Sequence, residues 1–268
     1  MVGFDFDKAT AVIAQVDGGF SAVVPSGWDI RGNANGGYVL ALISTAMCQA
    51  TNGRDPVTLT AHYLAPITAG PVQIITEIIK QGKRFTTVIA TIRQGDRDAV
   101  RAIGAFGQIM APTDGLVQVA GKPPTLPDFD DCVRVSSNGA KFPVALMDRV
   151  DIRLHPLDAG HFRGEPTGIA VVRGWFSFPD GRLIDARAML LATDSFPPAI
   201  FNLNINSGWV PTIELTVHVR AKPEPGPLRC VFVSRFVQGG MFEEDGELWD
   251  SRGVLVCQSR QLSLMPRT

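Results

Sequence analysis

The sequence predicts an α+β protein made of two similar units, each an antiparallel sheet packed around one buried helix. Three observations predict this fold. A segment near residue 60 is repeated near residue 216, a proline-rich stretch divides the chain, and the same order of elements recurs on both sides of that stretch. With 268 residues, 45% of them hydrophobic, the chain can form one large domain or two domains of about 130 residues each.

The repeat is clearest when residues 57–72 (VTLTAHYLAPITAGPV) are set against residues 213–228 (IELTVHVRAKPEPGPL), a shift of 156 residues. Six of the sixteen positions are identical, whereas average residue frequencies would give roughly one. Two strands with a similar turn are one explanation, and a duplicated domain is the stronger one. The identical pairs are Leu59/Leu215, Thr60/Thr216, His62/His218, Ala65/Ala221, Gly70/Gly226 and Pro71/Pro227.

The stretch between the repeats reads as a linker. Residues 111–131 (APTDGLVQVAGKPPTLPDFDD) contain four prolines and show no regular hydrophobic period. Each proline also restrains the residue before it to extended geometry. We therefore expect an N-terminal domain over residues 1–111, a linker over 112–131 and a C-terminal domain over 132–268.

Both predicted domains contain one apolar helix and several strands. In the first, residues 37–50 are apolar nearly all round and follow the pair Gly36-Gly37, which predicts a buried helix. In the second, the helical part of residues 185–202 is interrupted by Pro197-Pro198. Asp245-Gly246 and Arg252-Gly253 are turn signals. The predicted strands are 58–64, 72–80, 85–93 and 99–109, then 150–154, 169–178, 214–220, 229–238, 247–250 and 254–264.

Composition excludes several classes of function. The 25 Lys and Arg residues nearly balance the 26 Asp and Glu residues, so no basic surface for nucleic acid is expected. The first residues are acidic where a signal peptide is basic, and the apolar stretch from Tyr38 to Ala50 is too short to span a bilayer. The four cysteines are widely spaced without a CxxC pair. We expect a cytoplasmic protein with no membrane span, no metal and no cofactor.

Four segments together resemble the double-hotdog acyl-CoA thioesterase II family. The resemblance spans most of the chain outside the linker, and it implies two tandem hotdog domains, an acyl-CoA substrate and a homo-oligomer. The segments that carry it are NANGGYVLALISTAM (33–47), TAHYLAPITAGPVQI (60–74), LLATDSFPPA (190–199), and the stretch from WVPTIELTVHVRA (209–221) through LWDSRGVLVCQSRQLSLM (248–265).

The resemblance also implies a catalytic set of Asp194, Thr216 and Gln261. A buried aspartate has a raised pKa and is the stronger base for it, and hydrogen bonds from a hydroxyl and an amide would keep it ionised and oriented. Asp194 could also be only a turn residue near Pro197-Pro198, Thr216 a structural strand residue like Thr60, and Gln261 a surface residue. Backbone N–H groups at Gly36 and Gly37, where a helix begins, could polarise the thioester carbonyl.

The duplication predicts a single active site. The shift of 156 residues sets Tyr38 opposite Asp194, and aligning the last strands sets Phe106 opposite Gln261. The first half therefore lacks both polar groups, and we expect it to line a tunnel for the acyl chain.

The sequence lacks the motifs of several other enzyme classes. The sequence has no G-x-S-x-G elbow, no H-E-x-x-H and no phosphate-binding loop. A hydratase of similar fold needs a histidine about five residues after its aspartate, where this chain has Ala199. His62 and His218 share a repeat position, which favours packing over catalysis. One alternative stays open: a non-catalytic protein that binds acyl-CoA or lipid.

Overall fold

The computed structural model describes residues 3–16, 18–113, 116–137, 144–205, 208 and 210–265. Trp209, the first residue of one segment that carries the resemblance, lies outside this part of the chain. Both halves contain one buried α-helix and an antiparallel set of strands, which confirms the predicted architecture. Within the described residues, none of the helices combines the length and the apolarity that a membrane crossing needs.

The first half is built around helix α2 (Gly36–Ala50), one residue longer than predicted. Helix α1 and strands β1 to β4 precede it and were not predicted. The remaining elements of this half are α1 (Asp5–Ala9), β1 (Ile13–Ala14), β2 (Phe20–Val24), β3 (Asp29–Ile30), β4 (Asn33–Ala34), β5 (Asp55–Tyr63), β6 (Gly70–Gln81), β7 (Phe85–Gln94) and β8 (Arg97–Gly107).

The second half is built around helix α3 (Ala186–Ala192), which ends before Pro197-Pro198 as expected. The other elements are the 3-10 helices η1 (Phe129–Asp131), η2 (Ala145–Asp148), η3 (Asp158–Arg163) and η4 (Ala199–Asn202), and the strands β9 (Val133–Arg134), β10 (Asp151–Leu154), β11 (Val171–Ser177), β12 (Thr212–Val219), β13 (Leu228–Val233), β14 (Val237–Gln238), β15 (Met241–Trp249) and β16 (Leu255–Leu264).

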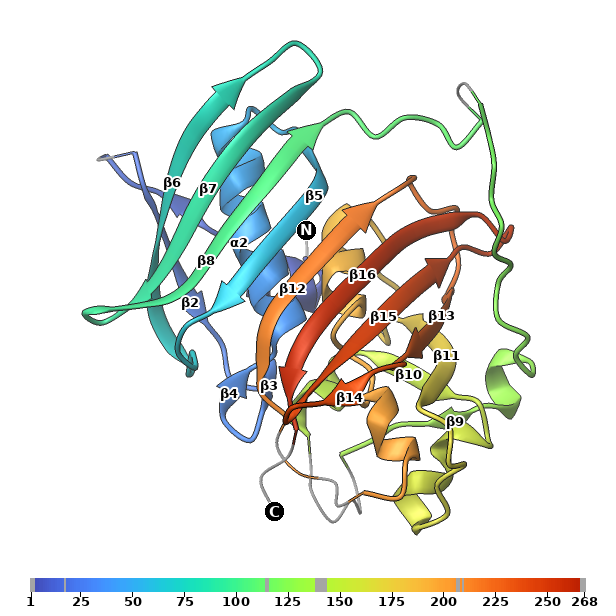
Figure 1. The fold of residues 1–268 in the computed structure, drawn as a ribbon. Helices are drawn as coiled ribbons and strands as arrows, with labels where there is room; N and C mark the ends of the chain where they lie inside the picture. The colour runs from blue at the N-terminus through green and yellow to red at the C-terminus, as the bar shows by residue number, and fades with distance from the viewer. Residues whose placement is uncertain are drawn as a thin grey trace.

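One sheet runs through both halves. Among the described residues it has 14 strands, in the order β1-β2-β6-β7-β8-β5-β12-β16-β15-β13-β11-β10-β9, with β14 paired to β15. Strands β5 and β12 lie side by side in its middle, and α2 packs against one face of the sheet (Figure 1). We call the face that carries the helices the inner face and the opposite one the outer face.

The register of β5 and β12 reveals an approximate twofold axis. Thr60 lies directly opposite its own repeat partner Thr216, and their hydroxyl oxygens are 2.8 Å apart. A residue that follows Thr60 on β5 pairs with the residue that precedes Thr216 on β12 by the same number of positions, and the reverse also holds. The two repeats therefore face each other across the axis. His62 and His218 are exposed on the outer face, so the packing role expected for them is wrong.

The helices form the buried core between the halves. Every residue of α2 from Gly37 to Met47 is buried, and each fully buried leucine or isoleucine stabilises the fold by about 1.5–3 kcal/mol. The Asn35 side chain caps α2 by accepting a hydrogen bond from the Tyr38 N–H at 2.9 Å. The Asp185 side chain caps α3 in the same way, from the Ala188 N–H at 2.8 Å.

The structure corrects both equivalences drawn from the repeat. Counted from the helix caps Asn35 and Asp185, the counterpart of Asp194 is Ser44 rather than Tyr38. Leu59 and Leu215 are repeat partners, and they pair with Gly104 and Gln261 respectively. The counterpart of Gln261 is therefore Gly104 rather than Phe106. The first half still has neither carboxylate nor amide at these two positions.

The turn expected at Asp245-Gly246 is also wrong. Strand β15 runs from Met241 to Trp249 and includes both residues. A Cβ atom at Gly246 would collide with the side chains of Phe232 and Ser259, so this glycine is needed for close packing inside a strand rather than for a turn.

Candidate functional site

Asp194 lies just beyond the end of α3 and contacts the beginning of α2. Its carboxylate Oδ2 accepts hydrogen bonds from the Gly37 N–H at 2.9 Å and from the Asn35 Nδ2 at 3.0 Å. The same Asn35 amide donates to the Asp194 carbonyl oxygen at 2.7 Å. The carboxylate of the second half is thus held by the helix terminus of the first half.

Two opposing effects set the acidity of this carboxyl group. Burial raises the pKa of Asp194 to about 6, and hydrogen bonds from Gly37, Asn35 and Gly36 limit that rise because they favour the ionised form. The positive end of the α2 dipole favours the anion as well. Asp194 is therefore mostly ionised at neutral pH and more basic than an exposed aspartate.

The glycine pair allows the two helices to approach. A Cβ atom at Gly37 would lie 2.7 Å from the Leu191 carbonyl oxygen, and one at Gly36 would lie 2.8 Å from Asp194 Oδ2. Any side chain at these positions would push α2 away from α3. The Gly37 N–H, expected as a free donor for a substrate carbonyl, is already engaged by the Asp194 carboxylate.

Tyr63 supports the same helix terminus. Its hydroxyl donates to the Gly36 carbonyl oxygen at 2.9 Å. Burial and the nearby charges of Asp194 and Glu214 hold the pKa of Tyr63 well above its usual value, so the phenol stays neutral. Tyr63 thus fixes the backbone turn that presents Gly36 and Gly37 to Asp194.

Gln261 lies on the inner face, among side chains that reverse the usual pattern of a strand. Ser259, Gln261 and Ser263 are buried there, whereas Leu262 and Leu264 are more than a third exposed on the outer face. Burying amides and hydroxyls requires hydrogen-bond partners. The Gln261 Oε1 and the Ser263 hydroxyl are buried and have no partner among the described residues. Both can therefore form a hydrogen bond with a polar ligand or a water molecule at this end of β16.

Glu244 is a second buried carboxyl group, and the sequence reasoning missed it. It lies directly opposite Gln261 on β15, and its Oε1 accepts a hydrogen bond from the Gln261 Nε2 at 3.4 Å. Its Oε2 accepts from the Ala199 N–H. Burial is the main cause that raises the pKa of Glu244 to about 8, and the charge of Asp194 contributes. Ala199 follows Asp194 by five residues, so the Ala199 hydrogen bond joins Glu244, and with it the facing Gln261, to the segment that follows α3.

Thr216 lies on the other face of the sheet from Gln261. Its hydroxyl contacts the hydroxyl of Thr60 and donates to the Glu214 carboxylate. Its partner on β16 is the exposed Arg260. The structure therefore does not place Thr216 with Asp194 and Gln261 on the inner face. An irregularity in β12 between Thr212 and Glu214 changes the alternation, and it sets Thr212 opposite the buried Ser263.

Of the residues that sequence reasoning missed, Asn35 carries a signal in the sequence, and Glu244 becomes recognisable from the structure. Asn35 directly precedes the first helical glycine, and asparagine is a preferred N-cap residue. Glu244 occupies a buried position in a strand that alternates buried and half-buried residues. A charged residue at an inward position is uncommon unless it has a partner.

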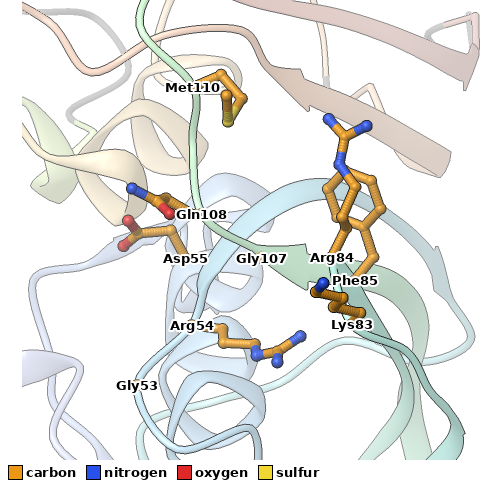
Figure 2. Close-up of a pocket in the computed structure, with 9 residues that line it drawn as sticks. All are labelled: Gly53, Arg54, Asp55, Lys83, Arg84, Phe85, Gly107, Gln108 and Met110. Atoms are coloured by element: carbon orange, nitrogen blue, oxygen red, sulfur yellow. The ribbon is translucent and has the colours of Figure 1, made fainter.

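Two cavities lie near the opposite end of α2 from Asp194. One, of about 490 Å³, is lined by residues of the β6–β7 turn and the ends of β5 and β8, and carries the basic side chains of Arg54, Lys83 and Arg84 (Figure 2). The other, of about 360 Å³, lies where α2 ends and α3 begins, next to Thr45, Cys48 and Arg187. Neither is lined by Asp194 or Gln261, so we locate the site by its hydrogen bonds and electrostatics.

Comparison with known proteins agrees with this arrangement. Residues 24–107 match the family described as acyl-CoA thioesterase N-terminal domain, and residues 129–265 match the acyl-CoA thioesterase C-terminal domain. An uncharacterized protein of Mycobacterium tuberculosis is 28% identical over 260 residues, which cover 89% of this chain and 88% of the relative.

Solved structures show the same fold over the whole chain. A protein assigned as a thioesterase II from Thermobifida fusca is 30% identical, with a TM-score of 0.89 and coverage of 100% of this chain and 99% of that one. A hotdog protein of unknown function from Alicyclobacillus acidocaldarius is 23% identical, with a TM-score of 0.87 and full coverage of both chains. With both of its halves matched in order, the chain belongs to the double-hotdog acyl-CoA thioesterase family.

Proposed function

We propose that this protein hydrolyses the thioester of an acyl-CoA to a free carboxylic acid and CoA, at one site per chain centred on Asp194. The observation that carries the proposal is the Asp194 carboxylate, held by Asn35 and Gly37 at the start of α2 in a chain of the acyl-CoA thioesterase family. A buried, hydrogen-bonded and mostly ionised carboxylate is what a general base requires.

The chemistry needs one water molecule and no cofactor. Asp194 takes a proton from the water while the water oxygen attacks the thioester carbonyl carbon. The tetrahedral intermediate then breaks its carbon–sulfur bond, and the departing sulfur receives the proton from Asp194. Negative charge on the carbonyl oxygen would be stabilised by the positive end of α2, next to which Asp194 lies.

Gln261 would orient the attacking water. Its buried Oε1 can accept one hydrogen of a water molecule while Asp194 accepts the other, which directs a lone pair of the water at the carbonyl carbon. We propose that Thr212, which shares the inner face with Gln261 and Ser263, supplies the hydroxyl of the site. Thr216 would instead join the two halves through Thr60.

A thiol-release assay tests the proposal. Purified protein is given acyl-CoA substrates with short, medium, long and aromatic acyl groups, and free CoA is measured with a thiol reagent. Multiple turnovers with at least one substrate would support hydrolysis. Tight binding without thiol release would favour the alternative, a non-catalytic acyl-CoA-binding protein. Homo-oligomerisation stays a prediction, and light scattering on the same preparation tests it.

Labelled water separates two forms of the mechanism. In a single turnover in ¹⁸O-water, a general base leaves the Asp194 carboxylate unlabelled and puts the label into the released acid. Direct attack by Asp194 would form an anhydride with the acyl group. Water that opens this anhydride at the Asp194 carbonyl would label the enzyme and leave the first released acid unlabelled, and hydroxylamine would trap the anhydride if water attacks the acyl carbonyl instead. We expect the unlabelled enzyme, because the Oδ2 of Asp194 is occupied by two donors.

A further inference from the structure

Glu244 is a buried carboxyl group that the proposed reaction does not yet use. It lies on the inner face of β15 with only 5% of its surface exposed, and its cross-strand neighbour Gln261 is equally buried. A carboxyl group in the interior destabilises a protein unless its oxygens find partners. Glu244 has two such partners, a backbone N–H group and a side-chain amide.

Both oxygens of Glu244 are used in a defined way. Oε2 accepts the N–H of Ala199, the first residue of η4, and therefore ties β15 to the loop that follows Asp194. Oε1 faces the Nε2 of Gln261 at 3.4 Å. No arginine or lysine neutralises this carboxyl group in the described part of the chain.

The contact decides which way the Gln261 amide points. An ionised carboxylate only accepts hydrogen bonds, so it selects the NH2 end of a facing amide. The Oε1 of Gln261 is then turned away from β15. That oxygen is buried without a partner among the described residues, and a buried carbonyl oxygen of this kind requires a donor.

We propose that Glu244 is a positioning residue: its carboxylate holds the Gln261 amide so that Oε1 accepts a hydrogen bond from the water that Asp194 activates. This inference rests on the proposed hydrolysis. If Glu244 is protonated on Oε1 instead, its O–H donates to the amide oxygen and the Gln261 side chain turns over, which removes the acceptor from the water.

The pH profile distinguishes this role from a merely structural one. The charged groups that act on Glu244 are Asp194 beyond α3 and Glu243 and Asp245 on its own strand, and all three raise the pKa of Glu244. We expect kcat/KM to rise in two steps, near pH 6 as Asp194 ionises and near pH 8 as Glu244 ionises. Since the two groups interact, the steps belong to the pair.

The variant Glu244→Gln should lose the upper step, because an uncharged amide can present either end to Gln261. At pH 9 its kcat should be about tenfold below that of the wild type, with KM within about twofold. Glu243→Gln is the matched control, since it removes a carboxylate from the adjacent position, which faces the outer side and accepts from the Arg235 and Phe236 N–H groups. It should keep both steps, with the upper step moved to slightly lower pH because the charge of Glu243 raises the pKa of Glu244. An upper step retained in Glu244→Gln would overturn the proposal.

A second measurement needs no turnover and works if Glu244→Gln folds poorly. In wild-type protein labelled with ¹⁵N-glutamine, the side-chain NH2 signal of Gln261 is identified by its absence in Gln261→Ala. It should titrate with a midpoint near pH 8. A signal that does not move between pH 6 and 10 would overturn the role of Glu244. Wild-type protein without thiol release but with a titrating signal would overturn the proposed function and support the Glu244–Gln261 contact.

Discussion

The two halves of the chain have the same framework and different polar groups. Each helix begins at a side-chain cap, Asn35 in α2 and Asp185 in α3, yet the same count along the helix ends at Ser44 in one half and at Asp194 in the other. Across the sheet, Gly104 occupies the position that Gln261 holds in the second half. The duplication thus preserved the packing in both halves, while the carboxylate and the amide of the proposed site are found in only one.

The contrast also has a steric basis. A Cβ atom at Gly104 would lie 2.7 Å from the Thr58 carbonyl oxygen and 2.9 Å from a methyl carbon of Leu59. No side chain fits there unless the strands move apart. The first half therefore lacks room for an equivalent of Gln261, in addition to lacking the carboxylate.

The largest effect is expected from Asp194→Asn. Loss of the general base should lower kcat by about 10³-fold, within the usual range of 10²–10⁴ for such groups. Ser44→Ala, at the matching position of the first half, should leave kcat unchanged. Thiol release by both variants checks this, and an Asp194→Asn enzyme with more than a tenth of the wild-type rate would contradict a single site at Asp194.

The same substitution should increase stability at neutral pH. The pKa of Asp194 is raised from 3.8 to about 6 in the folded protein, so the native state loses stability as the pH rises from about 4 to about 6, and the full penalty remains above pH 6. Asp194→Asn removes that penalty. We expect a melting temperature a few degrees above that of the wild type at pH 8 and a smaller difference at pH 4.

Gln261→Ala should give the next largest effect, a loss of about 10- to 100-fold in kcat, because the water would lose one of its two acceptors. Gly104→Ala in the other half should instead reduce stability by about 1–3 kcal/mol through overpacking. Its kcat, measured below the unfolding temperature, should stay near that of the wild type. Equal losses of kcat in both variants would show that Gln261 acts only through the packing of β16.

The two helix caps offer a more moderate contrast. Asn35→Ala should destabilise the protein by about 1 kcal/mol, since it removes an N-cap. Asp185→Ala should cost more than that, because Asp185 also accepts hydrogen bonds from the buried Arg182 and from Arg187. Only Asn35 also donates to the Asp194 carboxylate, and its loss should raise the pKa of Asp194 further. The acidic limb of kcat/KM should therefore move to higher pH in Asn35→Ala and stay in place in Asp185→Ala. A limb that moves equally in both variants would argue against this assignment.

The smallest effects should separate the two faces of β12. Thr212→Val, on the inner face, should lower kcat severalfold, whereas Thr216→Val on the outer face should change kcat by less than about twofold. The latter should lose about 1 kcal/mol of stability with the Thr60 contact, as should Thr60→Val. Activity that depends on Thr216 and not on Thr212 would restore the catalytic role that the family resemblance implied.

Sequence patterns were reliable where one periodicity dominates. Helix α2 was predicted to within one residue because its apolar run is uninterrupted and two glycines mark its start. The side of the sheet on which Thr216 lies could also have been read, since Leu215, Val217 and Val219 alternate with polar residues. The family resemblance, by contrast, implied that Thr216 lies with Asp194 and Gln261.

Other features depend on contacts between distant segments. Gly246 has the sequence signature of a turn, and only the neighbouring rings and hydroxyls explain why it lies inside β15. A constant shift of 156 residues does not pair Ser44 with Asp194. The strand repeats are 156 residues apart, but the helix caps Asn35 and Asp185 are only 150 residues apart. Glu244 could be recognised only once the structure showed that its side chain lies on the inner face of β15.

The pairing of β5 with β12, in which Thr60 lies opposite Thr216, has one more consequence. If the two units were separate, identical chains meeting along this axis, every amino-acid change would be made twice, once in each subunit. Joined in one polypeptide, each unit can mutate alone, so one can lose its reactive groups without disabling its twin. The fused chain thus gains an asymmetry that an assembly of identical copies cannot acquire.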